Sequence, residues 1–186
     1  MIDAVCNNKI KIQIRITNMT PEEKLASLNV GLPEAPLAVA NYVPCLQTGN
    51  LVMTAGQLPI AEGQVQFAGK VGAELSAEQG AQAARLTVLN GLAQIKSCIG
   101  EMSRVTRVVR LEGFVQSAEG FQQQSVVMNG ASDFIADVFG EAGRHTRTAV
   151  GVSELPLNAA CPVSYTHLRA HETREDRGLR RVGVKK

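Results

Sequence analysis

Two stretches of the chain repeat apolar residues at intervals of three and four, the spacing that places them on one face of an α-helix. The first begins at Ser76, which forms a capping-box pattern with Gln79, and ends at Gly100. The second runs from about residue 121 to residue 139, where Gly140 ends it. Eleven residues are predicted to face the core: Ala81, Ala84, Val88, Leu92, Ile95 and Ile99, then Val127, Ala131, Phe134, Ile135 and Val138.

Other segments alternate apolar and polar residues, as β-strands do. Strands are predicted at residues 42–46 and 51–54, with a turn between them and a short irregular hairpin around residues 62–63. A long strand is predicted at residues 105–115 and another at residues 147–152. This order predicts an α+β fold in which two long helices cover one face of a mixed sheet. The long strand should place on one face Val105, Val109, Leu111 and Val115.

The N-terminal part of the chain divides at Met19. Thr20, Pro21 and Glu23 have the types expected at the N-cap, first turn and capping box of a helix that runs to about Leu28. Before them, IKIQIRIT alternates as an edge strand would. Because Met19 resembles a natural start, we interpret residues 1–18 as a non-native or disordered extension, with an edge strand as the alternative.

The C-terminal part of the chain differs in its residue pattern from the segment before it. VSYTHLRAHET, at residues 163–173, looks like an in-frame translation of a sequencing adaptor. We therefore interpret residues 163–186 as an adaptor-derived, disordered tail and residues 19–162 as the domain. A basic tail for nucleic acid or an acidic partner is the alternative. A final strand should follow Pro156 and pair back into the sheet. Because the adaptor-like segment begins where this strand should be, the strand is expected to be missing.

Composition narrows the class of protein. Residues 1–162 carry twelve Lys/Arg and fourteen Asp/Glu, whereas residues 163–186 carry seven and three. The acidic body argues against nucleic acid as a partner, and no apolar run is long enough to cross a bilayer. The four cysteines are not spaced as metal ligands are, so we predict reduced thiols and a cytoplasmic location. We predict neither a metal nor a cofactor. We interpret Cys45 and Cys98 as buried small apolar residues.

Four segments carry a resemblance to a known family: ANYVPCLQTGNLVMTAGQLP, the helix from Ser76 with LNGLAQIK, VVRLEGFVQSAEGF, and GRHTRTAVGVSELP. Together they resemble the Rid/YjgF family of imine and enamine deaminases, whose members are often labelled endoribonucleases. The resemblance covers residues 20–160 and points to the branch with ANYVP and NGASD signatures. It implies a chorismate-mutase-like fold and a homotrimer whose ligand clefts lie between subunits.

The resemblance also implies the site residues. Arg147 matches an arginine that binds the carboxylate of a 2-imino or 2-enamino acid, through a fork of two parallel hydrogen bonds. Tyr42 and Asn129 match residues that line the cleft. Gly56 permits close approach of the backbone, and Thr148, which follows the arginine, completes the predicted ligand-binding set.

The residues themselves leave alternatives open. Arg147 would equally suit a surface ion pair with Glu154 or Glu141, Tyr42 a core position, and Asn129 a solvated helix position. His145, expected to be exposed, is a weak candidate for a general base.

One departure from the family bears on catalysis. Members active on imines carry a glutamate on the last strand that helps to position the attacking water, and by count from Arg147 this position falls at about Pro162. Proline can neither activate water nor donate to a sheet. The function implied is hydrolytic deamination to a 2-keto acid and ammonia, although a missing last strand would leave the chain inactive. A non-catalytic trimeric binder of small carboxylates is the alternative, and an endoribonuclease has less support because aromatic residues are few.

Overall fold

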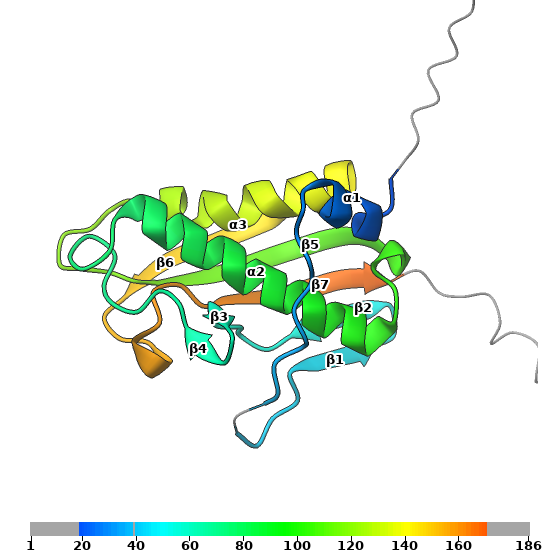
Figure 1. Cartoon of the computed structure of the whole chain (residues 1–186), viewed down its shortest axis with the longest axis horizontal. Helices are drawn as coiled ribbons and strands as arrows, with labels where there is room; N and C mark the ends of the chain where they lie inside the picture. Colours follow the sequence, from blue (N-terminus) through cyan, green and yellow to red (C-terminus); the bar gives the residue numbers. More distant parts are fainter. Residues whose placement is uncertain (1–18, 39, 171–186) are drawn as a thin grey trace, which may run out of the picture.

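The structure, a computed structural model, describes residues 19–38 and 40–170 of the chain. It has the predicted α+β class, with two long helices packed side by side across one face of a sheet (Figure 1). The helices are α1 (Pro21–Ser27), α2 (Ala77–Ile99) and α3 (Gln124–Phe139), and short 3-10 turns are η1 (Met102–Arg104), η2 (Gly140–Gly143) and η3 (Pro156–Asn158). The strands are β1 (Cys45–Thr48), β2 (Leu51–Thr54), β3 (Ile60–Ala61), β4 (Gln64–Val65), β5 (Val105–Gln116), β6 (Thr146–Val152) and β7 (Val163–Ala170).

The main sheet has the strand order β1-β2-β7-β5-β6, and β3 and β4 form a separate small hairpin. All neighbours in the main sheet run antiparallel except β5 and β6, which are parallel. A parallel pair needs a crossover connection, and α3 supplies it. The sheet therefore has β1 at one edge and β6 at the other.

Two of the three described helices, α1 and α2, begin where the sequence predicts. Thr20 with Glu23 and Ser76 with Gln79 each form a complete capping box, in which side chain and backbone satisfy each other's hydrogen bonds. The predicted core faces are confirmed with one exception, since Ala81 is only half-buried. The second long helix begins at residue 124 rather than 121.

One predicted strand face is wrong in detail. Val109 is exposed, and Val108 takes the buried position instead. The cause is irregular pairing of β5 with β7, whose register shifts between Val108 and Arg110. A bulge of this kind adds a residue to one strand and reverses the faces on either side, which simple alternation cannot anticipate.

The last strand, which was expected to be missing, is present. Residues 163–170 form β7 between β2 and β5, so the prediction of a disordered tail from residue 163 is wrong for this segment. Both neighbours present backbone groups that need partners, and VSYTHLRA supplies the strand between them. Its first residues alternate as the position requires, with Val163 and Tyr165 buried and Ser164 half-buried. Residues 1–18 and 171–186 lie outside the described residues.

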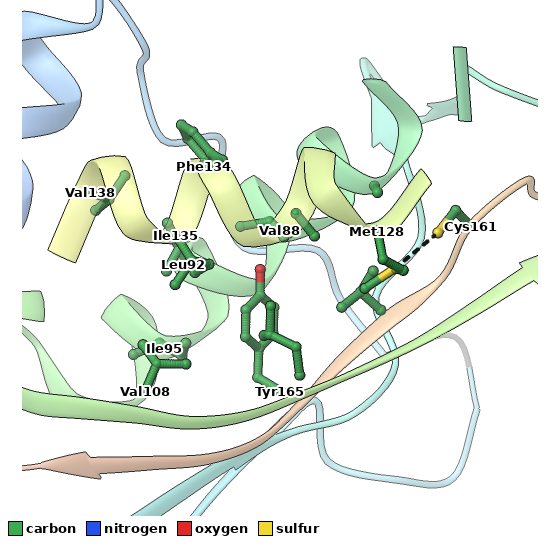
Figure 2. Packing of buried hydrophobic residues seen from close by; sticks show 14 of the residues in the cluster. Val88, Leu92, Ile95, Val108, Met128, Phe134, Ile135, Val138, Cys161 and Tyr165 are labelled. Atoms are coloured by element: carbon green, nitrogen blue, oxygen red, sulfur yellow. Dashed lines mark hydrogen bonds between the residues drawn. The ribbon is translucent and has the colours of Figure 1, made fainter. Parts of the chain in front are cut away.

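The core lies between the sheet and the two long helices (Figure 2). Glycines allow the layers to approach closely. A Cβ on Gly113 of β5 would lie 2.0 Å from the sulfur of Met128, and one on Gly130 of α3 would lie 2.1 Å from the carbonyl oxygen of Ala81 in α2. Hence α3 sits directly against both the sheet and the backbone of α2. Of the helices within the described residues, none is long and apolar enough to span a membrane.

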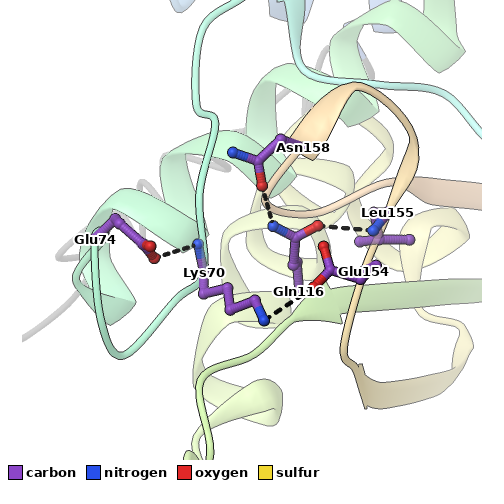
Figure 3. A network of polar contacts seen from close by, with 6 residues as sticks. All are labelled: Lys70, Glu74, Gln116, Glu154, Leu155 and Asn158. Atoms are coloured by element: carbon purple, nitrogen blue, oxygen red, sulfur yellow. Dashed lines mark hydrogen bonds and ion pairs between the residues drawn. The ribbon is translucent and has the colours of Figure 1, made fainter.

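A polar network fixes the connection between β6 and β7 (Figure 3). Gln116, fully buried at the end of β5, donates to the side-chain oxygen of Asn158 and accepts from the backbone N–H of Leu155 at 2.7 Å. Lys70 forms an ion pair with Glu154 at 3.0 Å in the same region. Asn158 has a positive φ of 54°, which the amide of Gln116 helps to hold.

The hydroxyl of Tyr165 ends among apolar side chains below α2 (Figure 2). It is completely buried, and among the described residues it has no hydrogen-bond partner. Burial accordingly raises the pKa of this phenol well above its ordinary value. A polar group in this situation costs free energy that an apolar group of the same shape would not.

We therefore predict that Tyr165→Phe raises the free energy of unfolding by about 1 kcal/mol, because it removes the unpaired hydroxyl and keeps the ring. Urea denaturation at a fixed protein concentration measures the change. Tyr42→Phe, at a tyrosine that is 46% exposed, is the matched control and should leave stability unchanged. A less stable Tyr165→Phe protein would mean that the hydroxyl has a partner.

Candidate functional site

Arg147 lies on β6, the edge strand beside α3. In the parallel pairing of β5 with β6 its Cα is opposite that of Leu111, a fully buried core residue. Paired residues in neighbouring strands point to the same face of the sheet. The arginine therefore projects toward the helices, but at the sheet edge, where it stays exposed to solvent.

Three hydrogen bonds tie the guanidinium to α3. Nη1 donates to the Oδ1 of Asn129 at 2.9 Å and to the Oγ of Ser132 at 3.0 Å. Nη2 donates to the backbone oxygen of Ser125 at 3.3 Å. The structure thus brings together Arg147 and Asn129, two of the residues predicted to bind ligand.

The remaining donors of Arg147 form a binding edge. A guanidinium has five N–H donors in a fixed planar fork. The described residues use both hydrogens of Nη1 and one of Nη2, which leaves the Nε hydrogen and one Nη2 hydrogen. Nε and Nη2 share one edge of the guanidinium, and this edge matches the two oxygens of a carboxylate. The arrangement can therefore hold a carboxylate without losing its contacts to α3.

A second layer of hydrogen bonds supports Ser132. Its Oγ lies 3.1 Å from Nε2 of His145, whose Nδ1 lies 2.6 Å from the carbonyl oxygen of Gly143. Because a carbonyl only accepts, Nδ1 of the imidazole carries a proton. Partial burial lowers the pKa of His145, and the positive charge of Arg147 lowers it further, against an opposing effect of the bond to Gly143. His145 is half-buried, so the expectation that it is exposed is wrong.

Arg147 does not form the ion pairs that were the alternative to ligand binding. Glu154 pairs with Lys70 at 3.0 Å, and Glu141 pairs with Arg144 at 3.1 Å. Among the described residues, the hydrogen-bond partners of the Arg147 guanidinium are all neutral. Its positive charge is therefore still available to an anion.

The other predicted ligand residues lie elsewhere in the chain. Tyr42 is exposed and precedes β1. β1 and β6, the strand of Arg147, are the two opposite edges of the main sheet (Figure 1). Four strand spacings of about 4.8 Å separate β1 from β6, or roughly 19 Å. Gly56 follows β2 on the same half of the sheet, and a side chain there would meet nothing within 4 Å. One chain therefore does not bring Tyr42 or Gly56 to the guanidinium.

Thr148 faces away from Arg147. Successive residues in a strand point to opposite faces, and the hydroxyl of Thr148 accepts from Nη2 of Arg110 at 3.1 Å. The same arginine pairs with Glu112 at 2.9 Å. Thr148 thus belongs to a charged cluster on the sheet face without helices.

The position expected to carry a glutamate holds no ionisable group. Pro162 is buried just before β7, where its carbonyl oxygen accepts from the N–H of Phe114 at 3.1 Å. The presence of β7 therefore restores the strand but not the carboxylate.

Two of the described cysteines, Cys45 and Cys161, lack the properties of nucleophiles. Burial raises the pKa of Cys45 to about 12, with a further contribution from a hydrogen bond to Cys98, and burial alone raises the pKa of Cys161 to about 12. In the part of the chain that the structure describes, no group of three or more His, Cys, Asp or Glu side chains is arranged to hold a metal.

Sequence reasoning missed Ser132 altogether and undervalued His145. Ser132 lies three residues after Asn129, so both face the same side of α3. That spacing, together with an alternating His-x-Arg on the following strand, was the available signal. It could identify a shared face but not the contact between helix and strand.

Comparison with known proteins agrees with this architecture. Residues 22–168 match the family model described as “YjgF/chorismate mutase-like, putative endoribonuclease”. Protein TCP17 of Trypanosoma cruzi is 43% identical over 140 residues, which cover 75% of this chain and 88% of that protein.

Solved structures are similar over the same region. A protein of unknown function from Agrobacterium tumefaciens, Atu1372, is 40% identical with a TM-score of 0.76, covering 82% of this chain and 94% of its own. A Shewanella oneidensis MR-1 protein named “putative endoribonuclease” is 37% identical with a TM-score of 0.78, covering 83% and 100%. The Escherichia coli YjgF gene product, 22% identical with a TM-score of 0.54, covers 75% and 94% and shares the fold. The chain therefore belongs to the YjgF/chorismate mutase-like family.

Proposed function

We propose that this protein hydrolyses 2-imino and 2-enamino acids to 2-keto acids and ammonia, with Arg147 binding the substrate carboxylate. The observation that carries the proposal is the free Nε–Nη2 edge of a guanidinium that three hydrogen bonds fix to α3. An arginine fixed in this way loses little further conformational freedom when it binds a ligand. Its planar fork of donors favours a planar carboxylate over a spherical anion.

Binding by the carboxylate places the reacting carbon next to the arginine. In a 2-imino acid the C=N carbon is bonded directly to the carboxylate carbon, so holding one positions the other. The oxygen of water adds to the C=N carbon, and the two protons of that water pass in turn to the nitrogen. The C–N bond then breaks and ammonia leaves as the C=O bond forms. The enamino acid enters the same sequence after its tautomerisation to the imine.

We further propose that the complete site forms between copies of the chain in a homotrimer. Arg147 and Tyr42 occupy opposite edges of one sheet, so a small ligand can contact both only if a second copy supplies one of them. Phe114 and Val150, each 39% exposed, are register partners on the sheet face without helices and offer an apolar surface for that association.

A non-catalytic carboxylate binder is the second candidate, and Pro162 is the observation that favours it. No carboxylate occupies the position where the family resemblance places a water-positioning glutamate. Nucleic acid and membranes are not among the proposed partners, since residues 1–162 carry more acidic than basic side chains. The cytoplasmic location stays a prediction.

Arg147→Ala should lower kcat/KM for 2-aminoacrylate, generated in situ, by about 100-fold, because a charge-assisted two-bond contact to the carboxylate is lost. Pyruvate formation above the rate in buffer is the measurement. Arg144→Ala is the matched control, since Arg144 is exposed and pairs only with Glu141 among the described residues. Equal activity of wild type and Arg147→Ala would contradict the proposal.

The same proteins separate enzyme from binder. If the wild type forms pyruvate no faster than buffer, the enzymatic proposal fails. Calorimetric binding of 2-ketobutyrate to the wild type, with none to Arg147→Ala, would then establish the binder.

Mixing subunits tests the location of the site. Tyr42→Ala and Arg147→Ala should each have low activity alone. When equal amounts of the two variants are unfolded and refolded together, the mixed trimers should recover about one quarter of the wild-type sites. This is the frequency at which random assembly places an intact Arg147 in one chain beside an intact Tyr42 in its neighbour. Product formation per protomer measures the recovery. A site contained in one chain would show no recovery, because every chain carries one substitution.

A further inference from the structure

The hydrogen bonds behind Arg147 continue through three elements of the fold. Arg147 on β6 donates to Ser132 on α3, and Ser132 contacts His145, the residue before β6. His145 in turn contacts Gly143 in η2. Each contact lies between 2.6 and 3.1 Å. The chain of contacts therefore joins the exposed arginine to the backbone of the turn after α3.

Two of the three hydrogen-bond directions follow from the groups at the ends of the chain of contacts. Arginine only donates, so the Oγ of Ser132 accepts from it, and the carbonyl of Gly143 only accepts, so Nδ1 of His145 donates. The Ser132 hydroxyl proton is then free to point at Nε2, which must be unprotonated to accept it. A neutral imidazole with its proton on Nδ1 satisfies every member of the chain.

We infer that Ser132 and His145 are positioning residues for Arg147, which fix its guanidinium with the Nε–Nη2 edge free for a ligand. This inference rests on the proposed carboxylate binding by Arg147. Without Ser132, one hydrogen of Nη1 would have no protein partner, and the guanidinium would keep only its bonds to Asn129 and to the backbone oxygen of Ser125, the longest of the three at 3.3 Å. A neutral His145 supports Ser132 without adding a second positive charge beside the arginine.

The surroundings of Ser132 support this role. Gly130, between Asn129 and Ser132 on α3, packs against the backbone of Ala81, and a Cβ there would lie 2.1 Å from that carbonyl oxygen. Gly143 is buried against Ile135, where a Cβ would lie 2.5 Å from the backbone oxygen. Ser132 in the middle of the hydrogen-bond chain and Gly143 at its end are therefore attached to closely packed backbone, so the chain can hold the arginine in a defined place.

Nitrogen-15 NMR of His145 tests the hydrogen-bond chain without any ligand. At pH 8 the wild type should show a protonated Nδ1 and an unprotonated Nε2. Ser132→Ala should shift this histidine toward a mixture of its two neutral forms, because Nε2 loses its donor. A protonated Nε2 in the wild type at pH 8 would overturn the inference, whatever the ligand measurements give.

Calorimetry with 2-ketobutyrate tests the consequence for binding. Ser132→Ala should bind about tenfold more weakly and Ser132→Thr, which keeps the hydroxyl, within about twofold of the wild type. His145→Phe should bind about fivefold more weakly. Ser27→Ala, on α1 far along the chain from the site, is the control and should bind as the wild type does. Urea denaturation of each variant confirms that it is folded; if His145→Phe does not fold, His145→Gln replaces it.

The outcomes separate this inference from the proposed function. If Ser132→Ala and the His145 variant bind like the wild type while Arg147→Ala does not bind, the inference is wrong and the proposed function stands. If Ser132→Thr is as weak as Ser132→Ala, the hydroxyl is not the cause and the inference is again wrong. If Arg147→Ala binds normally, the proposed function is wrong, and the positioning role fails with it.

Discussion

The close approach of α3 to its neighbours is the constraint on which the site depends. Two glycines permit it: Gly113 leaves room for Met128 above the sheet, and Gly130 brings α3 against the backbone of α2. A helix held farther from the sheet would carry Asn129 and Ser132 out of hydrogen-bond reach of Arg147. The functional geometry is therefore a consequence of backbone packing in the core.

The elements that the sequence predicts well are those with a local cause. A capping box begins α2, and three-four periodicity defines the core faces of both long helices, because hydrogen bonds and burial act within a few residues there. The buried face of β5 depends instead on a bulge opposite β7, so periodicity assigned Val109 to the wrong side. The sequence of β7 resembles a translated adaptor and therefore predicts a disordered tail. A strand position between β2 and β5, however, mainly requires alternation and backbone pairing.

The residues of the site also divide into those that the sequence identifies and those that only the structure shows. Arg147 and Asn129 were identified from family resemblance, and the contact between them is present at 2.9 Å. Ser132 and His145 were not, since their roles arise only when α3 and β6 meet. Thr148 was grouped with its neighbour in sequence, whereas strand alternation turns it toward Arg110 on the other face. Adjacency in sequence is thus a poor guide to adjacency in a site built on a strand.

The two edges of the sheet give the protein its proposed mode of action. One edge offers an arginine with a free binding edge and the other an exposed tyrosine, so self-association would complete a site that one chain leaves open. The most direct test is a crystal structure of the protein with bound 2-ketobutyrate. We predict its carboxylate on Nε and Nη2 of Arg147, with Tyr42 of a neighbouring copy beside the ligand. A ligand bound away from Arg147, or wholly within one chain, would contradict the central claim.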